Sequence, residues 1–339
     1  AEILAAFGGL RIAIVGDFFL DKYLDVDPSL AEVSIETGKT AHQVVAVRHS
    51  PGAAGTVAGN LAALGVRTLH AVGFCGNDGE GFELVADLEE LGCSVRHLHR
   101  AADRQTPTYL KPCDRTAPGL EGEHSRYDTK NRRPTSQALQ RSIADSLAAV
   151  VAEVDAVIVA DQVEEAECGV VTSQVRAALA DLAARNPRVI FWADSRMRIR
   201  QFRGLAIKPN QFEAIGQENP PQGERVAPEL LLAAMAALRR DAGAPVCITR
   251  GAAGMLVSDP EPIEVPGVRV EGPIDPTGAG DSATAGAVAA LAGGASLPEA
   301  ALVGNLVASI TIQELGTTGT ARPGQVRQRL ALWRRQHCC

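Results

Sequence analysis

The clearest chemical feature of the chain is the run Asp275-Pro276-Thr277-Gly278-Ala279-Gly280-Asp281, followed by a small-residue helix pattern over 282–291. Three small residues ahead of a helix leave backbone N–H groups bare and convergent, which favours anion binding. A carboxylate directly after that site would repel an anion. Its presence makes sense if it accepts a proton from a hydroxyl group while the site holds a transferring phosphoryl group. We therefore interpret Asp281 as a general base and the three residues before it as an anion site. A glycine-rich turn capped by an aspartate is the structural alternative for this segment alone.

The composition describes a globular protein and argues against several functional classes. The 339 residues are 46% hydrophobic and 22% charged, which permits a large core. The net charge of −7, without a dense Lys/Arg run, argues against a nucleic-acid partner. Seven cysteines form no CxxC pair, so neither a zinc site nor a disulfide framework is indicated. No apolar run approaches about 18 residues and no signal-peptide pattern opens the chain, so we expect a cytoplasmic protein without a membrane partner.

Short apolar runs end in polar side chains at several points along the chain. The run 11–16 leads to Asp17, and 154–160 leads to Asp161. The same arrangement recurs before three other polar positions, which are Asp194, Asn210 and Arg250. Alternating strands, polar tips and helices predict an α/β fold with a doubly wound, mostly parallel central sheet in a Rossmann-like three-layer arrangement. Ligands bind at the carboxyl ends of such strands, although helix capping explains some of these polar tips.

Two segments, about 22–50 and 104–128, interrupt this alternation. Neither has helical periodicity, and both indicate β-structure outside the main sheet. We expect them to form a small β lid that excludes water from a reaction, with a surface hairpin as the alternative. Without an internal repeat or a low-complexity linker, the chain is expected to be a single domain over 1–339.

On these residues the chain resembles the ribokinase or PfkB family of carbohydrate kinases over nearly its whole length. The run ending at Asp281 looks like the carboxyl-terminal signature of that family. Three further motifs follow the family's patterns: G-x-x-G-x-D-x-x-G over 73–81, N-x-x-E over 210–213 and T-x-G-x-x-G over 249–254. The resemblance implies a ribokinase-like fold with a β lid and ATP-dependent phosphorylation of a hydroxyl group.

Within the family, the opening segment 16–21 looks most like the bacterial heptose 7-phosphate kinases, so a heptose 7-phosphate is the favoured acceptor. One stretch departs from the family. Two glycines followed three residues later by an asparagine usually line the sugar site, whereas this chain has Gly52, Ala53 and Thr56. A hydroxyl group offers fewer hydrogen-bonding groups than an amide, so the pattern of sugar hydroxyls read there should differ. Ribose, a ketose or a nucleoside therefore stay open as acceptors.

The resemblance also implies roles for individual residues. Eight are expected near ATP: Asp194, Asn210, Glu213, Thr249, Gly251, Gly254, Thr277 and Asn305, the last beside adenine. Six are expected near the acceptor: Asp17, Asp21, Gly52, Asn60, Arg126 and Asp161. Mg²⁺ is expected near Asn210 and Glu213 through water, and a monovalent cation such as K⁺ near Asp275 and Gly316.

Basic residues are expected to bind phosphates. Arg196 or Arg198 is expected to steady the nucleotide phosphates, and a phosphate on the acceptor is expected to meet Lys111, Arg126 or Arg104.

Two interpretations come from other classes. A non-catalytic regulator that binds a sugar or nucleotide would not need the base Asp281. A nicotinamide dehydrogenase would need GxGxxG after the first strand, and Gly16-Asp17-Phe18 does not supply it. We expect a homodimer, because lid β-segments can pair across a two-fold axis.

Overall fold

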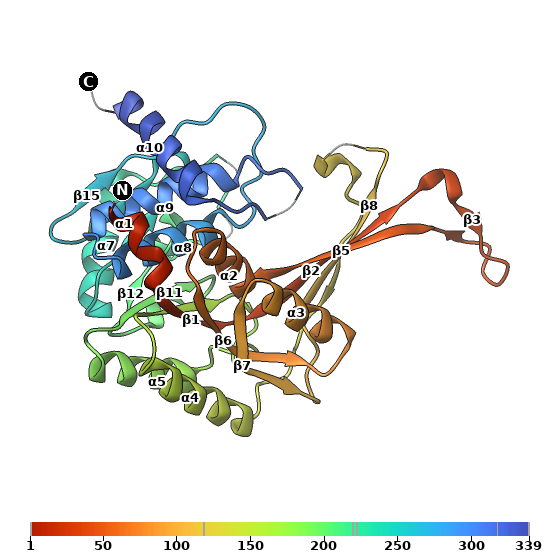
Figure 1. The fold of residues 1–339 in the computed structure, drawn as a ribbon, viewed down its shortest axis with the longest axis horizontal. Coiled ribbons are helices and arrows are strands. Elements are labelled where there is room, and N and C mark those ends of the chain that lie inside the picture. Colours follow the sequence, from red (N-terminus) through yellow and green to blue (C-terminus); the bar gives the residue numbers. More distant parts are fainter. Residues whose placement is uncertain (1, 118, 219, 222, 317, 338–339) are drawn as a thin grey trace.

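The computed structural model describes residues 2–117, 119–218, 220–221, 223–316 and 318–337; residue 118, in the second lid segment, lies outside these ranges. A six-stranded parallel sheet with the order β12-β11-β10-β1-β6-β7 forms its centre (Figure 1). Its strands are β1 (Arg11–Gly16), β6 (Thr68–Gly76), β7 (Cys93–Ala101), β10 (Ala156–Asp161), β11 (Ile190–Ser195) and β12 (Ala206–Ile207). The strand order runs away from β1 in both directions, which confirms the predicted doubly wound α/β fold.

Alternate residues of β1 face two separate cores, because successive side chains of a strand point to opposite faces. Ile12 and Ile14 contribute to the core that also contains residues of α2, α3, α8 and α9. Ala13 and Val15 contribute to the core on the other face, with residues of α4, α5 and α7. These helices are α2 (Ala54–Ala63), α3 (Gly79–Glu90), α4 (Gln137–Val151), α5 (Ser173–Arg185), α7 (Pro228–Ala242), α8 (Ala279–Ala292) and α9 (Leu297–Thr311). The three-layer arrangement predicted from the sequence is therefore confirmed.

The two segments that interrupt the alternation together form a second sheet, called the lid below, with the strand order β5-β2-β8-β9. Its strands are β2 (Phe18–Val26), β5 (Val44–Ala53), β8 (Thr108–Asp114) and β9 (Tyr127–Thr129), and the short β3 (Glu32–Val33) and β4 (Thr40–Ala41) pair beyond them. The far part of β2 and β5 projects from the body as an arm (Figure 1). The root of this sheet reaches the carboxyl end of β1, because β2 starts two residues after it.

A three-stranded antiparallel sheet continues beside β12, formed by β13 (Cys247–Thr249), β14 (Met255–Val257) and β15 (Ile263–Val265). Isolated bridges from Ile207 to Val246 and from Asn210 to Thr249 connect it to the main sheet. The remaining helices include α1 (Glu2–Ala6), α6 (Gln211–Ile215) and α10 (Pro323–His337). In the part of the chain that the structure describes, no helix is long and apolar enough to cross a membrane. A single functional domain over 1–339 stays a prediction.

Candidate active site

A cavity of about 330 Å³ lies where the root of the lid meets the N-terminus of α8. Thr277, Gly278 and Asp281 border it from the signature run, and Asp21 borders it from β2. The other bordering residues are Phe19, Ala53, Thr56, Tyr109, Lys111, Arg126, Lys130, Gln162, Glu164, Arg196 and Thr318. The fold therefore brings the anion site, the expected base and an acceptor-side carboxylate to one cavity.

The signature run forms the start of α8. Gly278 is the N-cap residue with φ 72°, a left-handed conformation that glycine adopts without strain. A Cβ atom at this position would lie 3.2 Å from Thr318 Cγ2 and 3.3 Å from Thr56 Cγ2, so a side chain would crowd the cavity wall. The first N–H groups of a helix have no intrahelical acceptor, and the helix dipole adds partial positive charge there. The geometry therefore suits an anion next to Asp281.

Burial raises the pKa of Asp281 to about 7, with a further contribution from the nearby Asp194 and an opposing one from Lys208. A carboxyl group with a pKa near neutrality is well matched to general-base chemistry. Asp194 itself binds Lys208, with Oδ2 2.8 Å from Nζ, and accepts a hydrogen bond from Thr284 Oγ1 at 3.1 Å. Asp194, which was expected near ATP, thus belongs to a buried charge cluster around Asp281.

On the acceptor side, Asp21 is 8% exposed and borders the cavity. Burial raises its pKa, whereas Lys111 and Arg126 oppose the shift. A Cβ atom at Gly52 would lie 2.5 Å from Asp21 Oδ2, so the glycine makes room for this carboxylate. The next residue, Ala53, has φ 54° and ψ −116°, a conformation that non-glycine residues rarely adopt.

Four basic side chains border the same cavity: Lys111, Arg126, Lys130 and Arg196. The Arg126 guanidinium lies 4.2 Å from the centre of the Tyr109 ring, and its Nε lies 2.6 Å from Asp128 Oδ1. Such side chains bind phosphate oxygens through charge-assisted hydrogen bonds. Lys130 was not named from the sequence, although the polar run 130–133 after the second lid segment carries three basic residues.

Asp17 lies at a strand tip as predicted, but its carboxylate is engaged by the backbone. Its oxygens accept hydrogen bonds from the N–H groups of Gln162, Val163 and Val170 at 2.9, 3.0 and 2.7 Å. The residue is 3% exposed, and burial raises its pKa to about 6. Asp17 therefore anchors the loop after β10, and its contact with acceptor hydroxyls stays a prediction.

Asp161, also expected near the acceptor, forms a buried ion pair instead. Its Oδ1 lies 2.6 Å from Arg198 Nη2, and its Oδ2 accepts a hydrogen bond from Ser195 Oγ at 2.6 Å. Arg198 Nη1 also donates to the carbonyl of Glu164 at 3.1 Å. Arg198 is therefore occupied in fixing this loop, and of the two arginines expected near nucleotide phosphates only Arg196 borders the cavity.

Two more expected contacts are structural. Asn60 is fully buried, and its Nδ2 donates to the carbonyl of Thr56 at 3.0 Å. Arg104 is 6% exposed, and its guanidinium donates to the carbonyls of Arg133 and Pro134. Each satisfies backbone acceptors inside the fold, so neither is directed to an acceptor or its phosphate.

The N-x-x-E motif forms the capping box of α6. Asn210 Oδ1 accepts from the N–H group of Glu213 at 2.9 Å, and Glu213 Oε2 accepts from the N–H group of Asn210 at 2.7 Å. Burial raises the pKa of Glu213 to about 7. Both residues border a second cavity of about 450 Å³, which shares Glu164 and Arg196 with the first. The two cavities therefore adjoin at Arg196.

Two of the other residues expected near ATP, Gly254 and Asn305, contact the segment 265–266, whereas Thr277 borders the first cavity. A Cβ atom at Gly254 (φ 87°) would lie 2.2 Å from the carbonyl oxygen of Val265, which explains the glycine. Asn305 Nδ2 donates to the same carbonyl at 3.0 Å. Thr249 ends β13 beside Asn210, and Gly251 begins the turn that leads to Gly254. Contact of these residues with ATP stays a prediction.

The expected monovalent-cation residues occupy different surroundings. Asp275 Oδ1 accepts a hydrogen bond from the N–H group of Thr277 at 3.0 Å, which fixes the turn before α8. Gly316 borders a further cavity of about 390 Å³ beneath the lid, together with Tyr23 and Arg48. A shared cation site at these two residues stays a prediction.

Comparison with known proteins agrees with this geometry. The model of the pfkB family carbohydrate kinases matches residues 13–323, and the chain belongs to this family. The "Bifunctional protein HldE" of Caulobacter sp. (strain K31) is 32% identical over 94% of the chain, and the match covers 62% of that protein. Ribokinase of Cryptococcus neoformans var. grubii serotype A in complex with ADP superposes with a TM-score of 0.64 at 20% identity, covering 94% of this chain and 99% of that one. Phosphofructokinase-2 of Escherichia coli in complex with fructose-6-phosphate superposes with a TM-score of 0.67 at 19% identity, covering 96% and 100%.

The family identifies the protein as a phosphotransferase that acts on a sugar hydroxyl group. The predicted ribokinase-like fold is confirmed by the structural neighbours. The chain spans less than two thirds of the length of the curated relative, so that relative's whole activity is not transferred to it.

Proposed function

We propose that the protein transfers the γ-phosphoryl group of Mg-ATP to a hydroxyl group of a sugar that already carries a phosphate, with a heptose 7-phosphate favoured. The observation that supports this most is one cavity that combines Asp281 and Gly278 with four basic side chains. Carboxylates such as Asp21 suffice to accept hydrogen bonds from the hydroxyls of a neutral sugar. The excess of cations is better matched to an acceptor that brings its own negative charge.

In the proposed reaction, Asp281 accepts the proton of the acceptor hydroxyl while the hydroxyl oxygen forms a bond to the γ-phosphorus. The bond from the γ-phosphorus to the β–γ bridging oxygen breaks, and ADP leaves. Backbone N–H groups of Gly278 and Gly280 stabilise the charge that develops on the γ-phosphoryl oxygens, whereas the N–H group of Ala279 donates to the carbonyl of Pro276 at 3.1 Å. Asp21 orients the sugar by accepting hydrogen bonds from its hydroxyls. Arg196, which borders both cavities, neutralises phosphate charge between the two substrates.

The cations belong to the same proposal. Bound Mg²⁺ neutralises nucleotide phosphate charge, and Asn210 and Glu213 would hold it through water. Within the described ranges, no cluster of three or more His, Cys, Asp or Glu side chains is arranged to hold a metal ion. A water-mediated site that relies on the phosphates fits this donor set, since Mg²⁺ keeps much of its water shell. K⁺ near Asp275 and Gly316 is proposed from the family resemblance alone.

The test is ADP release with Mg-ATP and matched acceptor pairs: ribose and ribose 5-phosphate, fructose and fructose 6-phosphate, and a heptose and its 7-phosphate. We expect turnover with a phosphorylated member, and a loss of about 10²–10⁴-fold in Asp281→Asn. Turnover with neutral sugars or nucleosides alone would overturn the phosphosugar assignment. ATP binding without turnover of any acceptor would favour the non-catalytic regulator.

A phosphorylated ketose is the second candidate acceptor. The departure at Ala53 and Thr56 keeps it open, because both residues border the cavity and replace the glycine and asparagine of the family pattern. The structural neighbour in complex with fructose-6-phosphate shows that this fold accommodates such a compound in that protein. The fructose 6-phosphate arm of the panel separates it from the heptose.

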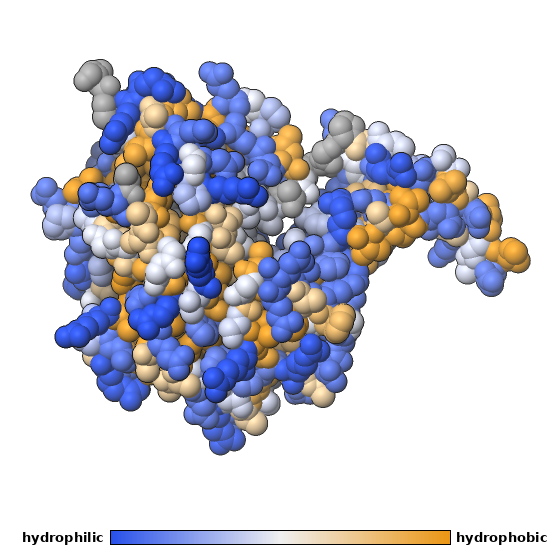
Figure 2. Space-filling model, in the orientation of Figure 1, coloured by the Kyte–Doolittle hydropathy of each residue, from blue (hydrophilic) through white to orange (hydrophobic). Residues whose placement is uncertain are grey.

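We further propose a cytoplasmic homodimer formed through the arms. Apolar side chains gather on the projecting arm (Figure 2). Val33, Ile35, Val44 and Val47 are 72%, 98%, 45% and 50% exposed. Covering these side chains with a second copy would remove apolar surface from water.

A further inference from the structure

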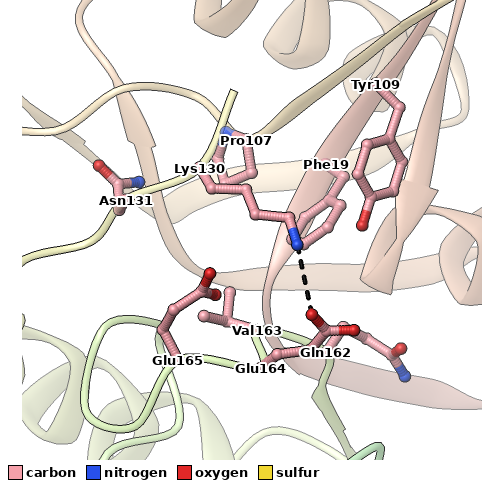
Figure 3. Close-up of a pocket in the computed structure, with 9 residues that line it drawn as sticks. All are labelled: Phe19, Pro107, Tyr109, Lys130, Asn131, Gln162, Val163, Glu164 and Glu165. Carbon is pink, nitrogen blue, oxygen red and sulfur yellow. Dashed lines mark hydrogen bonds and ion pairs between the residues drawn. The ribbon is translucent and has the colours of Figure 1, made fainter. Parts of the chain in front are cut away.

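One carboxylate connects two of the cavity's cations. Glu164 Oε2 lies 3.3 Å from Lys130 Nζ, and its Oε1 lies 3.1 Å from Arg196 Nε. Figure 3 shows the Lys130 side chain directed at Glu164, with its end beside Phe19. Lys130 follows β9 in the lid, whereas Arg196 follows β11 in the main sheet. Glu164 therefore holds together two basic side chains from separate sheets.

The backbone of Glu164 is fixed, but its side chain is not buried. Arg198 donates to the Glu164 carbonyl at 3.1 Å, and Asp17 accepts from the N–H groups of the two preceding residues. The side chain of Glu164 is 42% exposed, while those of Lys130 and Arg196 are 23% and 55% exposed. Ion pairs this open to water are weak, so the carboxylate can turn away at little cost.

We infer that Glu164 is an internal competitor of the acceptor's phosphate: in the free enzyme it pairs with Lys130 and Arg196, and it releases them when that phosphate enters. This inference rests on the proposed function. A phosphate group offers three acceptor oxygens and nearly two negative charges, so it binds the two cations more strongly than one carboxylate does. A neutral acceptor leaves the Glu164 contacts in place and gains nothing from Lys130.

The same contact has a consequence for other anions. An anion must displace Glu164 before it reaches Lys130 and Arg196, so the carboxylate lowers the apparent affinity for every anion at this position. Acceptors whose hydroxyl groups also donate hydrogen bonds to Asp21 regain the lost binding affinity through these additional contacts. Glu164 thereby keeps free phosphate weakly bound, whereas a phosphorylated sugar still binds through its contacts with Asp21.

The test compares Glu164→Gln with Glu165→Gln in the full chain. Glu165 lies next in the same loop, and its Oε1 lies 3.4 Å from Arg132 Nη1, so the control removes the same charge from a different pair. Binding of inorganic phosphate is measured by titration calorimetry, and KM is measured for a phosphorylated acceptor, its neutral counterpart and ATP. In Glu164→Gln we expect phosphate to bind roughly threefold to tenfold more tightly and KM for the phosphorylated acceptor to fall by a similar factor. KM for the neutral sugar should stay unchanged, and KM for ATP measures the effect on the second cavity, which Glu164 and Arg196 also border.

A double-mutant comparison tests whether the gain in phosphate affinity arises from the contact between Glu164 and Lys130. In Lys130→Met, the added Glu164→Gln change should raise phosphate affinity less than it does in the wild-type background, because one of the two cations is already absent. Unchanged or weaker phosphate binding in Glu164→Gln relative to Glu165→Gln would overturn the inference and make Glu164 a support for the cations. Phosphate binding is measured without any acceptor, so it stands apart from the proposed function, which fails if the wild-type protein phosphorylates no sugar phosphate.

Discussion

Lys208 and Asp194 form a buried ion pair beside the expected base, with Lys208 Nζ 2.8 Å from Asp194 Oδ2. Lys208 is 4% exposed, and a Cβ atom at Gly280 would lie 3.6 Å from its Nζ. The ammonium group therefore lies close to the N-terminus of α8. It opposes the shift that burial and Asp194 impose on the pKa of Asp281. Two residues outside the signature run thus adjust the pKa of Asp281, on which burial has the largest effect.

This arrangement predicts the pH dependence of the reaction. Because burial raises the pKa of Asp281 to about 7, the base is protonated below that pH, and kcat/KM should fall about tenfold per pH unit on the acid side. Lys208→Met removes a positive charge, so the acid limb should move to higher pH. Lys22→Met is the control, since Lys22 pairs with Glu83 of α3. The profile is measured with saturating Mg-ATP, and an acid limb near pH 4 would contradict the role of Asp281.

The lid cations should act on phosphorylated acceptors. Arg126→Met is expected to raise KM for the phosphorylated acceptor by roughly tenfold to a hundredfold, because a charge-assisted contact is lost. KM for ATP should change little. Arg115→Met, on the same lid but 55% exposed and bordering a different cavity, is the matched control. An equal effect on phosphorylated and neutral acceptors would show that Arg126 shapes the lid and does not bind phosphate.

Asp17→Asn should destabilise the protein. The carboxylate accepts three backbone hydrogen bonds, whereas an amide has one oxygen and would direct its NH₂ group toward an N–H donor. We expect the free energy of unfolding to fall by about 2–4 kcal/mol in urea titrations. The exposed Asp103→Asn should change it by less than about 0.5 kcal/mol. A stable Asp17→Asn variant with a raised KM for the acceptor would instead show that Asp17 contacts the acceptor.

Ala53→Gly should stabilise the protein. Ala53 holds a positive φ of 54°, which costs a residue with a Cβ atom about 1–3 kcal/mol, and glycine relieves most of this at a smaller entropic cost. The free energy of unfolding should rise by about 1 kcal/mol. Ala62→Gly, in the last turn of α2, should lower it by about 0.5–1 kcal/mol. If both variants lose stability alike, Ala53 is not strained.

The arm is expected to join two copies. Light scattering after gel filtration should give about twice the chain mass of 35.5 kDa. The paired changes Val44→Lys and Val47→Lys place charge on exposed apolar positions of β5 and should yield monomers with an unchanged melting temperature. The comparison is Glu32→Lys, which changes the charge at another exposed position of the arm. A wild-type monomer at micromolar concentration would reject this proposal.

The sequence determined the architecture and the position of Asp281, the proposed base. The alternation of apolar runs and polar tips predicted the doubly wound sheet, and the run ending at Asp281 predicted the start of α8, because both patterns lie within a few neighbouring residues. Strands β7, β14 and β15 were not predicted, since β7 is rich in polar residues and β14 and β15 are only three residues long.

The tertiary structure decided which side chains reach the cavity. Asp17 and Asp21 stand four residues apart, yet Asp17 binds the loop after β10 while Asp21 borders the cavity. Lys130, Glu164 and Arg196 meet only because β9, β10 and β11 end near one another. A polar side chain at a strand tip takes whichever partner the fold brings within hydrogen-bonding distance, and that partner is distant in the sequence. Local spacing therefore predicts the kind of residue at the site, and packing selects the ones that act there.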